Sequence, residues 1–518
     1  MIKNDHTLHL YNSLTKGEVP FVLRQAQDDT AQDKVVTMYT CGPTVYGRPH
    51  IGNYSSFLMA DLLRRWLEVG GYTVKHVKNI TDVGHLLHDA DTGDDKIEKQ
   101  AREERVDPLA IAKKYEAMYL EDEKALNMLP MEPKNRPHAT EYIKEMIEII
   151  NQLLQKGNAY ETDDGIYFSV ETFPKYGELS GNTLDNLNAG ARIAVDETKK
   201  HPADFALWKK CVWNNNHHVL RWSFESGERS SSVGDDPLSG FPGWHIECSA
   251  MSSALLGHII DIHTGGEDNI FPHHECEIAQ SECGSGVHPF VRVWLHKRRI
   301  EIQKEGTLRQ TQGDITAVMS KSLGNVLTVP DIIEAGFSAL DLRYYLLSVH
   351  YRTRLKFTWK GMEDSRKARR KIVEWISEMG ETGETRETKE KQDTQQHPPV
   401  LSSVEGFPGA AFEEKFAAAM NADLNTPAAL AAIFDAMTHS RNHPQESCAN
   451  FIEMIRHTFG CFDAEEEKIP DEIEQLKIAR DSARASKNFA ESDRLRGEIE
   501  GRGFTVKDTK EGQMIRKK

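Results

Sequence analysis

Residues 35–53 read VVTMYTCGPTVYGRPHIGN. The run Val35–Tyr39 is apolar and strand-like, whereas the apolar residues between Phe57 and Leu67 recur with the spacing of a helix. A strand that turns into a helix across Pro49-His50-Ile51-Gly52-Asn53 presents backbone N–H groups and the positive end of a helix. This arrangement suits a bound polyphosphate, and His50 can donate a hydrogen bond to its oxygens.

A second short motif, Met319-Ser320-Lys321-Ser322, lies far along the chain. Lys321 is a mobile point charge that can follow phosphate groups as negative charge builds in a transition state. Either motif alone most often has no function. The two in this order, one at a strand-to-helix turn and one in a loop, together indicate activation of a substrate by ATP.

The two motifs resemble the signatures of class I aminoacyl-tRNA synthetases, and four longer strings narrow the resemblance to the cysteinyl-tRNA synthetases. These strings are YTCGPTVY at 39–46, GWHIECSAM at 243–251, FPHHECEIAQ at 271–280 and DLNTP at 423–427. Because they extend over nearly the whole chain, the resemblance implies a cysteine–tRNA ligase of protein biosynthesis. Such an enzyme activates L-cysteine with ATP and transfers it to the 3′ end of its tRNA.

Composition sets the broad class. The chain has 518 residues, which at roughly 100 to 200 residues per domain predicts three or four domains. It is 39% hydrophobic and 28% charged, and no apolar run approaches the ~18 residues of a membrane span. Met1–His6 lacks an apolar signal region, so we expect a cytoplasmic protein. The resemblance implies a monomer.

Charge and cysteine content limit the partners. Seven cysteines, an odd number, do not form a disulfide framework and are expected to be thiols or metal ligands. The net charge of −16 argues against indiscriminate nucleic-acid binding, so a tRNA must meet local basic patches. Candidates are Lys297–Arg299, Arg366–Lys371 and Arg516–Lys518, and a solvated charged face is the alternative for each.

Alternating strand and helix patterns from about 20 to 150 predict a parallel α/β unit without a dinucleotide fingerprint. Short strands, at 165–170 and 205–208, then interrupt the alternation, which resumes at Ile259–His263; beyond Asp331 the pattern is helical. With the resemblance, this predicts a Rossmann-like catalytic domain (1–156 and 241–305), an inserted acceptor-end domain (157–240), a signature-loop and stem-contact region (306–365), a helical tRNA-binding bundle (366–468, with a disordered loop at 378–399) and a C-terminal anticodon-recognition module (469–518).

Cys41, Cys248, His273 and Glu277 form the most specific constellation. His273 and Glu277 are four residues apart in a helical pattern and share a face, and these four donor types suit tetrahedral Zn²⁺. The alternative is that both cysteines are ordinary buried core residues, because spacing alone does not predict a contact between cysteines two hundred residues apart. The four positions match the family's zinc ligands residue by residue, which implies one zinc ion per subunit that accepts the substrate thiolate.

Two neighbours of these positions, His274 and Cys276, compete as ligands, although the family pattern favours Glu277. A zinc site would discriminate cysteine from serine better than the shape of a pocket would. Shape separates the binding of close isosteres by only about 1–3 kcal/mol, whereas a serine hydroxyl is a hard, poorly acidic ligand for zinc. No editing domain is then required.

The resemblance also assigns roles to other residues. His50, Asn53 and Lys321 would stabilise the transferring phosphoryl group. Thr44 and Trp244 would shape the amino-acid pocket. ATP, with Mg²⁺, would contact Gly52, His263, Gly265, Gly266, Asp268 and Lys321. A plain tight turn after the strand is the competing interpretation of the two glycines.

Four features depart from the family pattern. Asn53 stands where the first signature usually has its second His, a variant seen in this family. Val318 stands where the second signature usually begins with Lys, and the stretches 211–240 and 297–317 are longer or less regular than expected. We therefore expect reduced but real activity, because the missing Lys removes one phosphate contact while Lys321 remains. The second stretch lies where a hairpin should carry the signature loop, so it bears on the placement of Lys321. Two alternatives are a cysteine:amino-sugar ligase of the same fold, which lacks an anticodon-recognising end, and a silent paralogue that binds zinc and a nucleotide or RNA.

Overall fold

The structure is a computed structural model in which contacts divide the chain into two units, residues 1–462 and 463–518, each described here by itself. The described residues are 7–23, 34–84, 86, 95–184, 186, 199–212, 218–230, 237–303, 316–318, 326–381, 408–443, 448–464, 470–509 and 512–517.

A four-stranded parallel sheet forms the centre of the first unit. Its strands, in spatial order, are β10 (Val291–Lys297), β9 (Ile260–Gly266), β3 (Val35–Thr40) and β4 (Thr73–Lys78). The chain leaves β3 through helix α1 toward β4 on one side, and leaves β9 through helix α7 toward β10 on the other. The carboxyl ends of β3 and β9 therefore flank the point where strand order reverses, which is where open α/β sheets bind ligands.

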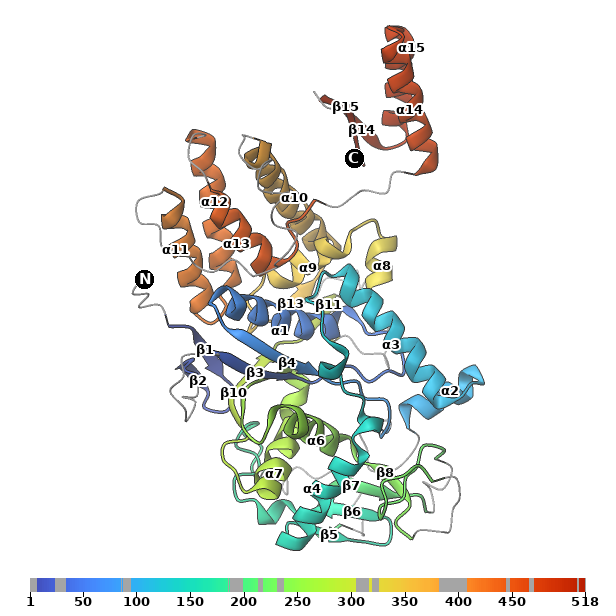
Figure 1. Ribbon diagram of the computed structural model, residues 1–518, viewed down its shortest axis with the longest axis vertical. Helices are drawn as coiled ribbons and strands as arrows, with labels where there is room; N and C mark the ends of the chain where they lie inside the picture. Colours follow the sequence, from blue (N-terminus) through green and yellow to red (C-terminus); the bar gives the residue numbers. More distant parts are fainter. Residues whose placement is uncertain are drawn as a thin grey trace, which may run out of the picture. The chain divides into compact units, whose positions relative to one another are not determined.

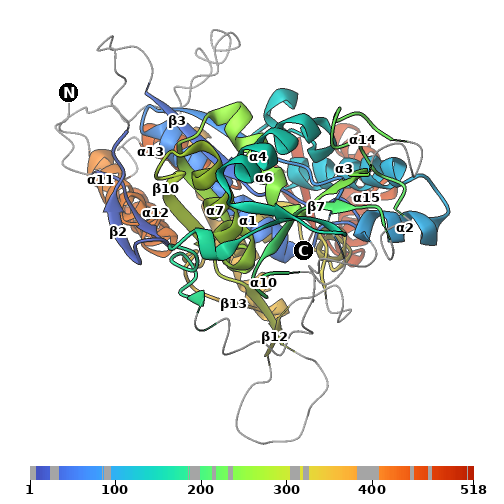
Figure 2. The same ribbon diagram turned by 90° about the horizontal axis from the view of Figure 1, so that it is seen from below.

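Helix α1 (Ile51–Val69) is buried along most of its length, including the charged side chains of Asp61 and Arg65. It contacts β4, β9 and β10 of the sheet, and also helices α9 (Ala339–Leu347) and α13 (Ala449–Phe459). Strands β3 and β4 also contact α6 (Trp244–Leu256), which packs on α7 (Glu275–Ser285). Figures 1 and 2 show these helices gathered around the central strands. The predicted α/β class is confirmed by this parallel sheet and its crossover helices.

A second, antiparallel sheet interrupts the parallel one in sequence. Its strands are β5 (Ala159–Glu161), β6 (Gly165–Phe168), β7 (Phe205–Lys210) and β8 (Gly240–Pro242), paired in that order. The strand patterns predicted at 165–170 and 205–208 are confirmed as β6 and β7. Strand β8 was missed because three residues with a glycine and a proline carry no strand signal.

The hairpin before the second motif is formed. Strands β11 (Ile300–Gln303) and β12 (Thr316–Val318) pair antiparallel, with Glu301 opposite Val318, and β13 (Leu355–Phe357) pairs parallel to β11. The stretch 297–317, which was predicted to be irregular, therefore has paired strands near both of its ends. Residues 304–315 and 319–325 lie outside the described residues, and Lys321 is among them.

Helices make up the rest of the first unit's C-terminal half, as predicted. Helix α10 (Trp359–Glu381) runs four residues into the stretch expected to be a disordered loop, because Met379 continues the apolar face and packs on the core. Residues 382–400 lie outside the described residues. The other helices of this half are α8 (Val329–Glu334), α11 (Pro408–Asn421) and α12 (Thr426–Asn442).

The remaining elements of the first unit flank the sheet. They are β1 (His9–Asn12) and β2 (Gly17–Pro20), helices α2 (Lys96–Glu104), α3 (Pro108–Ala125) and α4 (Ile143–Lys156), and short 3-10 helices at Pro133–Asn135, Ala139–Glu141, Val170–Thr172 and Glu267–Asn269. Within the described part of the chain, no helix is both long and apolar enough to cross a membrane.

The second unit has its own small core. Helices α14 (Asp471–Ala485) and α15 (Phe489–Gly501) pack on the antiparallel hairpin β14 (Phe504–Thr509) and β15 (Gly512–Lys517). A cluster of buried apolar residues joins them: Ile473, Ile499, Phe504, Val506 and Ile515. Both helices were predicted, whereas β15 was missed because its polar residues hide the strand pattern.

Two of the basic runs proposed as tRNA patches are partly neutralised within the protein. Lys297 is buried, which lowers the pKa of its amine to about 8, and Arg299 pairs with Asp268. In the second run, Arg369 is buried and bonds Asp341 at 2.9 Å. These contacts reduce the positive charge that the two runs offer to phosphate groups, although Lys367, Arg370 and Lys371 are exposed.

Candidate metal centre and active site

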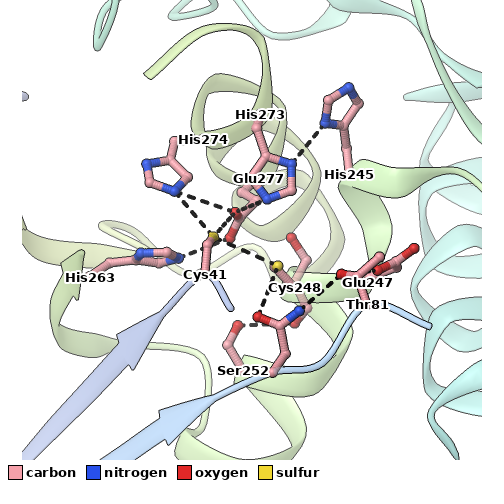
Figure 3. A network of polar contacts seen from close by, with 12 residues as sticks. Cys41, Thr81, His245, Glu247, Cys248, Ser252, His263, His273, His274 and Glu277 are labelled. Carbon is pink, nitrogen blue, oxygen red and sulfur yellow. Dashed lines mark hydrogen bonds and ion pairs between the residues drawn. The ribbon is translucent and has the colours of Figure 1, made fainter. Parts of the chain in front are cut away.

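Four side chains from four separate segments meet at the carboxyl end of β3. Cys41 directly follows β3, Cys248 lies in α6, His273 lies in a π-helical turn and Glu277 lies in α7. One donor atom from each lies within 4.8 Å of the others, and all four residues are buried. Figure 3 shows them pointing toward one another. The sequence alone joined only His273 and Glu277, which share a turn.

The individual distances define a compact donor set. The two sulfur atoms lie 3.8 Å apart, and Cys41 Sγ lies 3.5 Å from Glu277 Oε1. His273 Nε2 lies 3.0 Å from Glu277 Oε1. His273 belongs to the irregular turn Ile270–His274 and α7 begins only at Glu275, yet the spacing of four still brings both side chains to one side.

A histidine, rather than a side chain of fixed positive charge, offsets the acidic groups of this set. Burial opposes ionisation of Glu277, but His263 and His273 hold the pKa of its carboxyl well below the usual range. Burial also opposes ionisation of Cys248, but a hydrogen bond from Cys41 and the charge of His273 lower its pKa to about 6. In turn, despite burial, Glu277 and Cys248 raise the pKa of His273 to about 10. The compensating charge is thus a proton on the His273 imidazole.

This chemistry fits a divalent metal ion. Thiolates, an imidazole and a carboxylate are the donors that zinc takes, and a cation would replace the His273 proton and leave Nε2 as a ligand. The other ring nitrogen of His273 is already held, since Nδ1 lies 3.1 Å from His245 Nδ1. Trp244 stacks on the His273 ring with centroids 4.3 Å apart. Such outer contacts orient a ligating histidine.

A second donor set shares two members with the first. Cys41 and Glu277 also converge with His263 and His274, and Figure 3 shows these two histidines on the side of Cys41 away from Cys248. His274 Nε2 lies 3.2 Å from Cys41 Sγ, so this predicted competitor reaches the cluster. Cys276, the other competitor, belongs to neither set, and its sulfur contacts the Tyr176 hydroxyl at 3.4 Å.

His263, predicted to contact ATP, lies within this cluster. Its Nε2 is 3.1 Å from Glu277 Oε2, and its ring stacks on Trp294 with centroids 4.6 Å apart. The side chain is fully buried. Its position gives it a role in holding Glu277, which sequence patterns did not indicate.

The first motif forms the N-terminus of α1 as predicted. His50 is the N-cap, its Nδ1 accepts from the Asn53 N–H, and Asn53 Oδ1 accepts from the His50 N–H at 3.1 Å. The Ile51 N–H donates to the Leu327 carbonyl at 2.8 Å. Gly52 lies in the first turn of this helix. The chain that follows the second motif is therefore tied to the helix end that the first motif forms.

The glycines predicted to lie in a loop after β9 are the last residues of that strand. A Cβ on Gly265 would lie 2.6 Å from His274 Cε1, so only glycine leaves room for that ring. A Cβ on Gly266 would lie 3.4 Å from Ser56 Oγ of α1. The end of β9 thus runs close to both the histidine cluster and α1. Asp268 follows in a 3-10 helix, with its side chain 61% exposed.

Thr44 and Trp244, the predicted pocket residues, are both half-buried. Thr44 pairs with Thr81, which follows β4. Trp244 is the first residue of α6 and contacts His273 as described. Asn79 was missed by sequence reasoning: its Oδ1 accepts from the Gly42 N–H at 2.8 Å and fixes the turn after Cys41.

Comparison with known proteins identifies the class. The family model described as the class I tRNA synthetase (C) catalytic domain matches residues 27–367. Among solved structures, an Agrobacterium radiobacter K84 LeuRS in a ternary complex with tRNA and LeuAMS has a TM-score of 0.57 at 11% identity and covers 84% of this chain and 85% of its own. Mycobacterium tuberculosis methionyl-tRNA synthetase with methionyl-adenylate has a TM-score of 0.50 at 13% identity, covering 83% and 88%. The fold is that of a class I aminoacyl-tRNA synthetase.

Relatives narrow this to one family. A cysteine–tRNA ligase of Thermus thermophilus is 38% identical over 520 residues and 98% of each chain. That of Chlorobaculum tepidum is 36% identical over 542 residues and 99% of each chain. A DALR domain matches 415–459, and the cysteinyl-tRNA ligase anticodon binding domain matches 466–516. The chain belongs to the cysteinyl-tRNA synthetase family, as the resemblance predicted.

Proposed function

We propose that this protein activates L-cysteine with ATP, giving cysteinyl-adenylate and pyrophosphate, and then transfers the cysteinyl group to the 3′ end of its tRNA. The observation that carries the proposal is the convergence of Cys41, Cys248, His273 and Glu277 at the carboxyl end of β3. This cluster lies at the reversal of strand order, and β3 leads directly into the helix whose first turn holds His50.

Cys41, Cys248, His273 and Glu277 would hold one zinc ion. When bound, zinc supplies a soft Lewis acid that takes up the thiolate of cysteine far better than the hydroxyl of serine. The half-buried Trp244 stacks on His273 and, with Thr44, would border the bound amino acid. This arrangement selects by ligand chemistry rather than by shape, which separates such isosteres poorly.

The phosphate end of the substrate would lie at the N-terminus of α1. There His50, Gly52 and Asn53 sit at the positive end of a helix that stabilises anions. The carboxylate of cysteine attacks the α-phosphate in line, the bond to pyrophosphate breaks, and Lys321 with Mg²⁺ offsets the leaving charge. No side chain forms a covalent intermediate.

The adenosine of ATP would lie along the end of β9. Gly265 and Gly266 allow a ligand close to the strand backbone, next to His263 and Asp268. In the second step, a ribose hydroxyl of the terminal tRNA adenosine attacks the activated carbonyl and AMP leaves. We extend the proposal to a monomer that acts in the cytoplasm.

The match of residues 466–516 to an anticodon binding domain supports the tRNA ligase over a cysteine:amino-sugar ligase, which lacks that end. The sequence departure at Val318 motivates a direct test of activity. Val318 lies in β12 and pairs with Glu301 of β11, so the strand that leads toward Lys321 is regular.

The experiment is cysteine-dependent exchange of pyrophosphate into ATP, followed by charging of the tRNA, with serine alongside. Exchange and charging with cysteine alone are expected. Lys321→Ala should reduce exchange strongly, and Lys360→Ala, an exposed lysine of α10 outside the proposed basic patches, serves as its matched control. Exchange without charging would favour the amino-sugar ligase, and neither reaction would indicate a silent paralogue.

A further inference from the structure

Three side chains form a line of hydrogen bonds that ends at Cys41. Ser13 Oγ lies 2.8 Å from His296 Nδ1, and His296 Nε2 lies 2.8 Å from His274 Nδ1. His274 Nε2 lies 3.2 Å from Cys41 Sγ. All four residues are buried, with at most 8% of any exposed, so water does not compete for these bonds. The line connects the turn after β1 to the proposed metal centre.

The chemistry of the groups gives this line one direction. A neutral imidazole donates from one nitrogen and accepts at the other, and burial favours the neutral form. A thiolate accepts hydrogen bonds and donates none. When Cys41 is a thiolate, His274 must donate from Nε2 and accept at Nδ1 from His296 Nε2–H. His296 Nδ1 then accepts from the hydroxyl of Ser13.

Both ends of the line are held in place by the fold. The Ser13 N–H donates to the Trp294 carbonyl at 2.9 Å, and the Trp294 N–H donates to Asn12 Oδ1 at 3.1 Å. The turn after β1 is therefore fastened to β10, the strand that carries His296. The His274 ring occupies the space left by the missing side chain of Gly265. Neither ring can move far without disturbing a strand.

We propose that Ser13, His296 and His274 are positioning residues that act as a one-way chain of hydrogen-bond donors onto the Cys41 thiolate and set how strongly that sulfur donates to the bound metal. The inference rests on the metal centre proposed above. A hydrogen bond to a metal-bound thiolate draws electron density from the sulfur, which leaves the metal a stronger Lewis acid toward the substrate thiol. Outer partners of metal ligands commonly change affinity about 10- to 100-fold.

The test uses two matched pairs of variants in the full-length protein. His274→Gln keeps an N–H donor near Cys41, whereas His274→Met fills similar space without one. Ser13→Thr keeps the hydroxyl, whereas Ser13→Ala removes it. Two residues of the line, His296 and His274, separate Ser13 from Cys41. Ser440→Ala, which removes a buried hydroxyl bonded to Trp375 in the helical bundle, controls for loss of a buried hydrogen bond elsewhere.

Two readouts separate tuning of the metal from a structural effect. Zn²⁺ affinity is measured by chelator competition, and the thiolate-to-metal charge-transfer band is recorded after Co²⁺ replaces zinc. His274→Met should shift the band to longer wavelength, because the sulfur becomes more electron-rich. It should also weaken binding about 10- to 100-fold, because the Cys41 thiolate loses the donor that stabilises and orients it. Ser13→Ala should shift both in the same direction by less. His274→Gln, Ser13→Thr and Ser440→Ala should resemble the parent.

The proposal is overturned if Ser13→Ala and His274→Met leave the affinity and the band unchanged, or if each matched pair behaves alike. If His274→Met does not fold, the Ser13 pair decides by itself. A parent protein that binds no metal would instead overturn the metal centre, and with it this inference. Metal binding by the parent without any shift in the variants would overturn the chain of donors alone.

Discussion

Two buried clusters of charged side chains lie in the same unit, and they solve the problem of burial in different ways. One is the donor set of Cys41, Cys248, His273 and Glu277. The other joins Asp61 and Arg65 of α1 to Arg343 of α9, with Arg343 fully buried. We refer to them as the donor cluster and the arginine cluster.

The arginine cluster is complete in itself. Asp61 Oδ2 accepts from Arg65 Nε at 2.8 Å and from Arg343 Nη2 at 2.5 Å, and its Oδ1 accepts from the Leu129 N–H. The remaining guanidinium donors bond carbonyls near the C-terminal ends of α3 and α13, at Leu126, Asn127, His457 and Phe459. Helix ends carry unpaired carbonyls and a partial negative charge, so the two arginines match them.

The donor cluster is balanced differently. Its two thiols and one carboxylate are offset by imidazoles, and the proton on His273 can be lost. Buried acidic donors that are compensated by a removable proton can exchange that proton for a metal cation. A carboxylate that is already paired with arginines has no such charge to exchange and serves the packing of the helices. The comparison teaches that the kind of compensating charge, more than burial, separates a binding site from a structural ion cluster.

The largest expected effect is on activity, through the donor cluster. Cys248→Ser should lower cysteine-dependent pyrophosphate exchange by at least about a thousandfold, roughly 4 kcal/mol of transition-state stabilisation, because a soft ligand is lost. Steady-state exchange assays measure this. Cys283→Ser, a half-buried thiol of α7 that belongs to neither donor set, should keep the parent rate. Equal losses in both variants would contradict the assignment.

The next effect is on stability, through the arginine cluster. Asp61→Asn leaves two guanidinium groups without their anion in a buried place and should cost about 3 kcal/mol. Denaturant unfolding followed by circular dichroism measures the change, and metal analysis of the same sample should match the parent. A variant as stable as the parent, or one that loses metal, would break the distinction between the two clusters.

Metal removal should act on one cluster only. Free zinc at about 100 times its dissociation constant stabilises the folded state by about 2.7 kcal/mol, which chelation removes. Thermal unfolding should therefore shift on chelation in the parent and in Asp61→Asn. Cys248→Ser should show little shift. A large shift in Cys248→Ser would mean that the stabilising metal lies elsewhere.

The smallest expected effect is a pH dependence of the arginine cluster. Although burial opposes it, Arg65 and Arg343 hold the pKa of Asp61 well below its usual value near 3.8. A depressed pKa gives stability that is present above the unfolded-state value and is lost as pH falls toward the folded-state value. Unfolding curves below pH 4 should therefore fall more steeply for the parent than for Asp61→Asn. Parallel curves would contradict this linkage.

Sequence patterns predicted what is local in this molecule. The strand and helix around His50 follow from apolar spacing, and His273 and Glu277 follow from a spacing of four. Cys41 and Cys248 joined them only through the family resemblance, since nothing local connects residues so far apart. The same reason hid the partnership of His274 with His296 and Ser13.

Asp61 illustrates the limit from the other side. Within α1 it pairs with Arg65 at a helical spacing that a sequence can suggest, but its second partner lies 282 residues away. Likewise Gly265 and Gly266 were expected in a loop, because their closeness to the His274 ring and to α1 appears only once the sheet is assembled. Long-range packing determines these features, and apolar periodicity does not predict long-range contacts.

The most direct test of the account is to measure zinc content and cysteine-dependent pyrophosphate exchange on the same samples of the parent and of Cys248→Ser. We expect one zinc ion per parent chain, exchange with cysteine and not with serine, and loss of both zinc and exchange on chelation and in the variant. Exchange at the parent rate in protein shown to contain no metal would contradict the central claim.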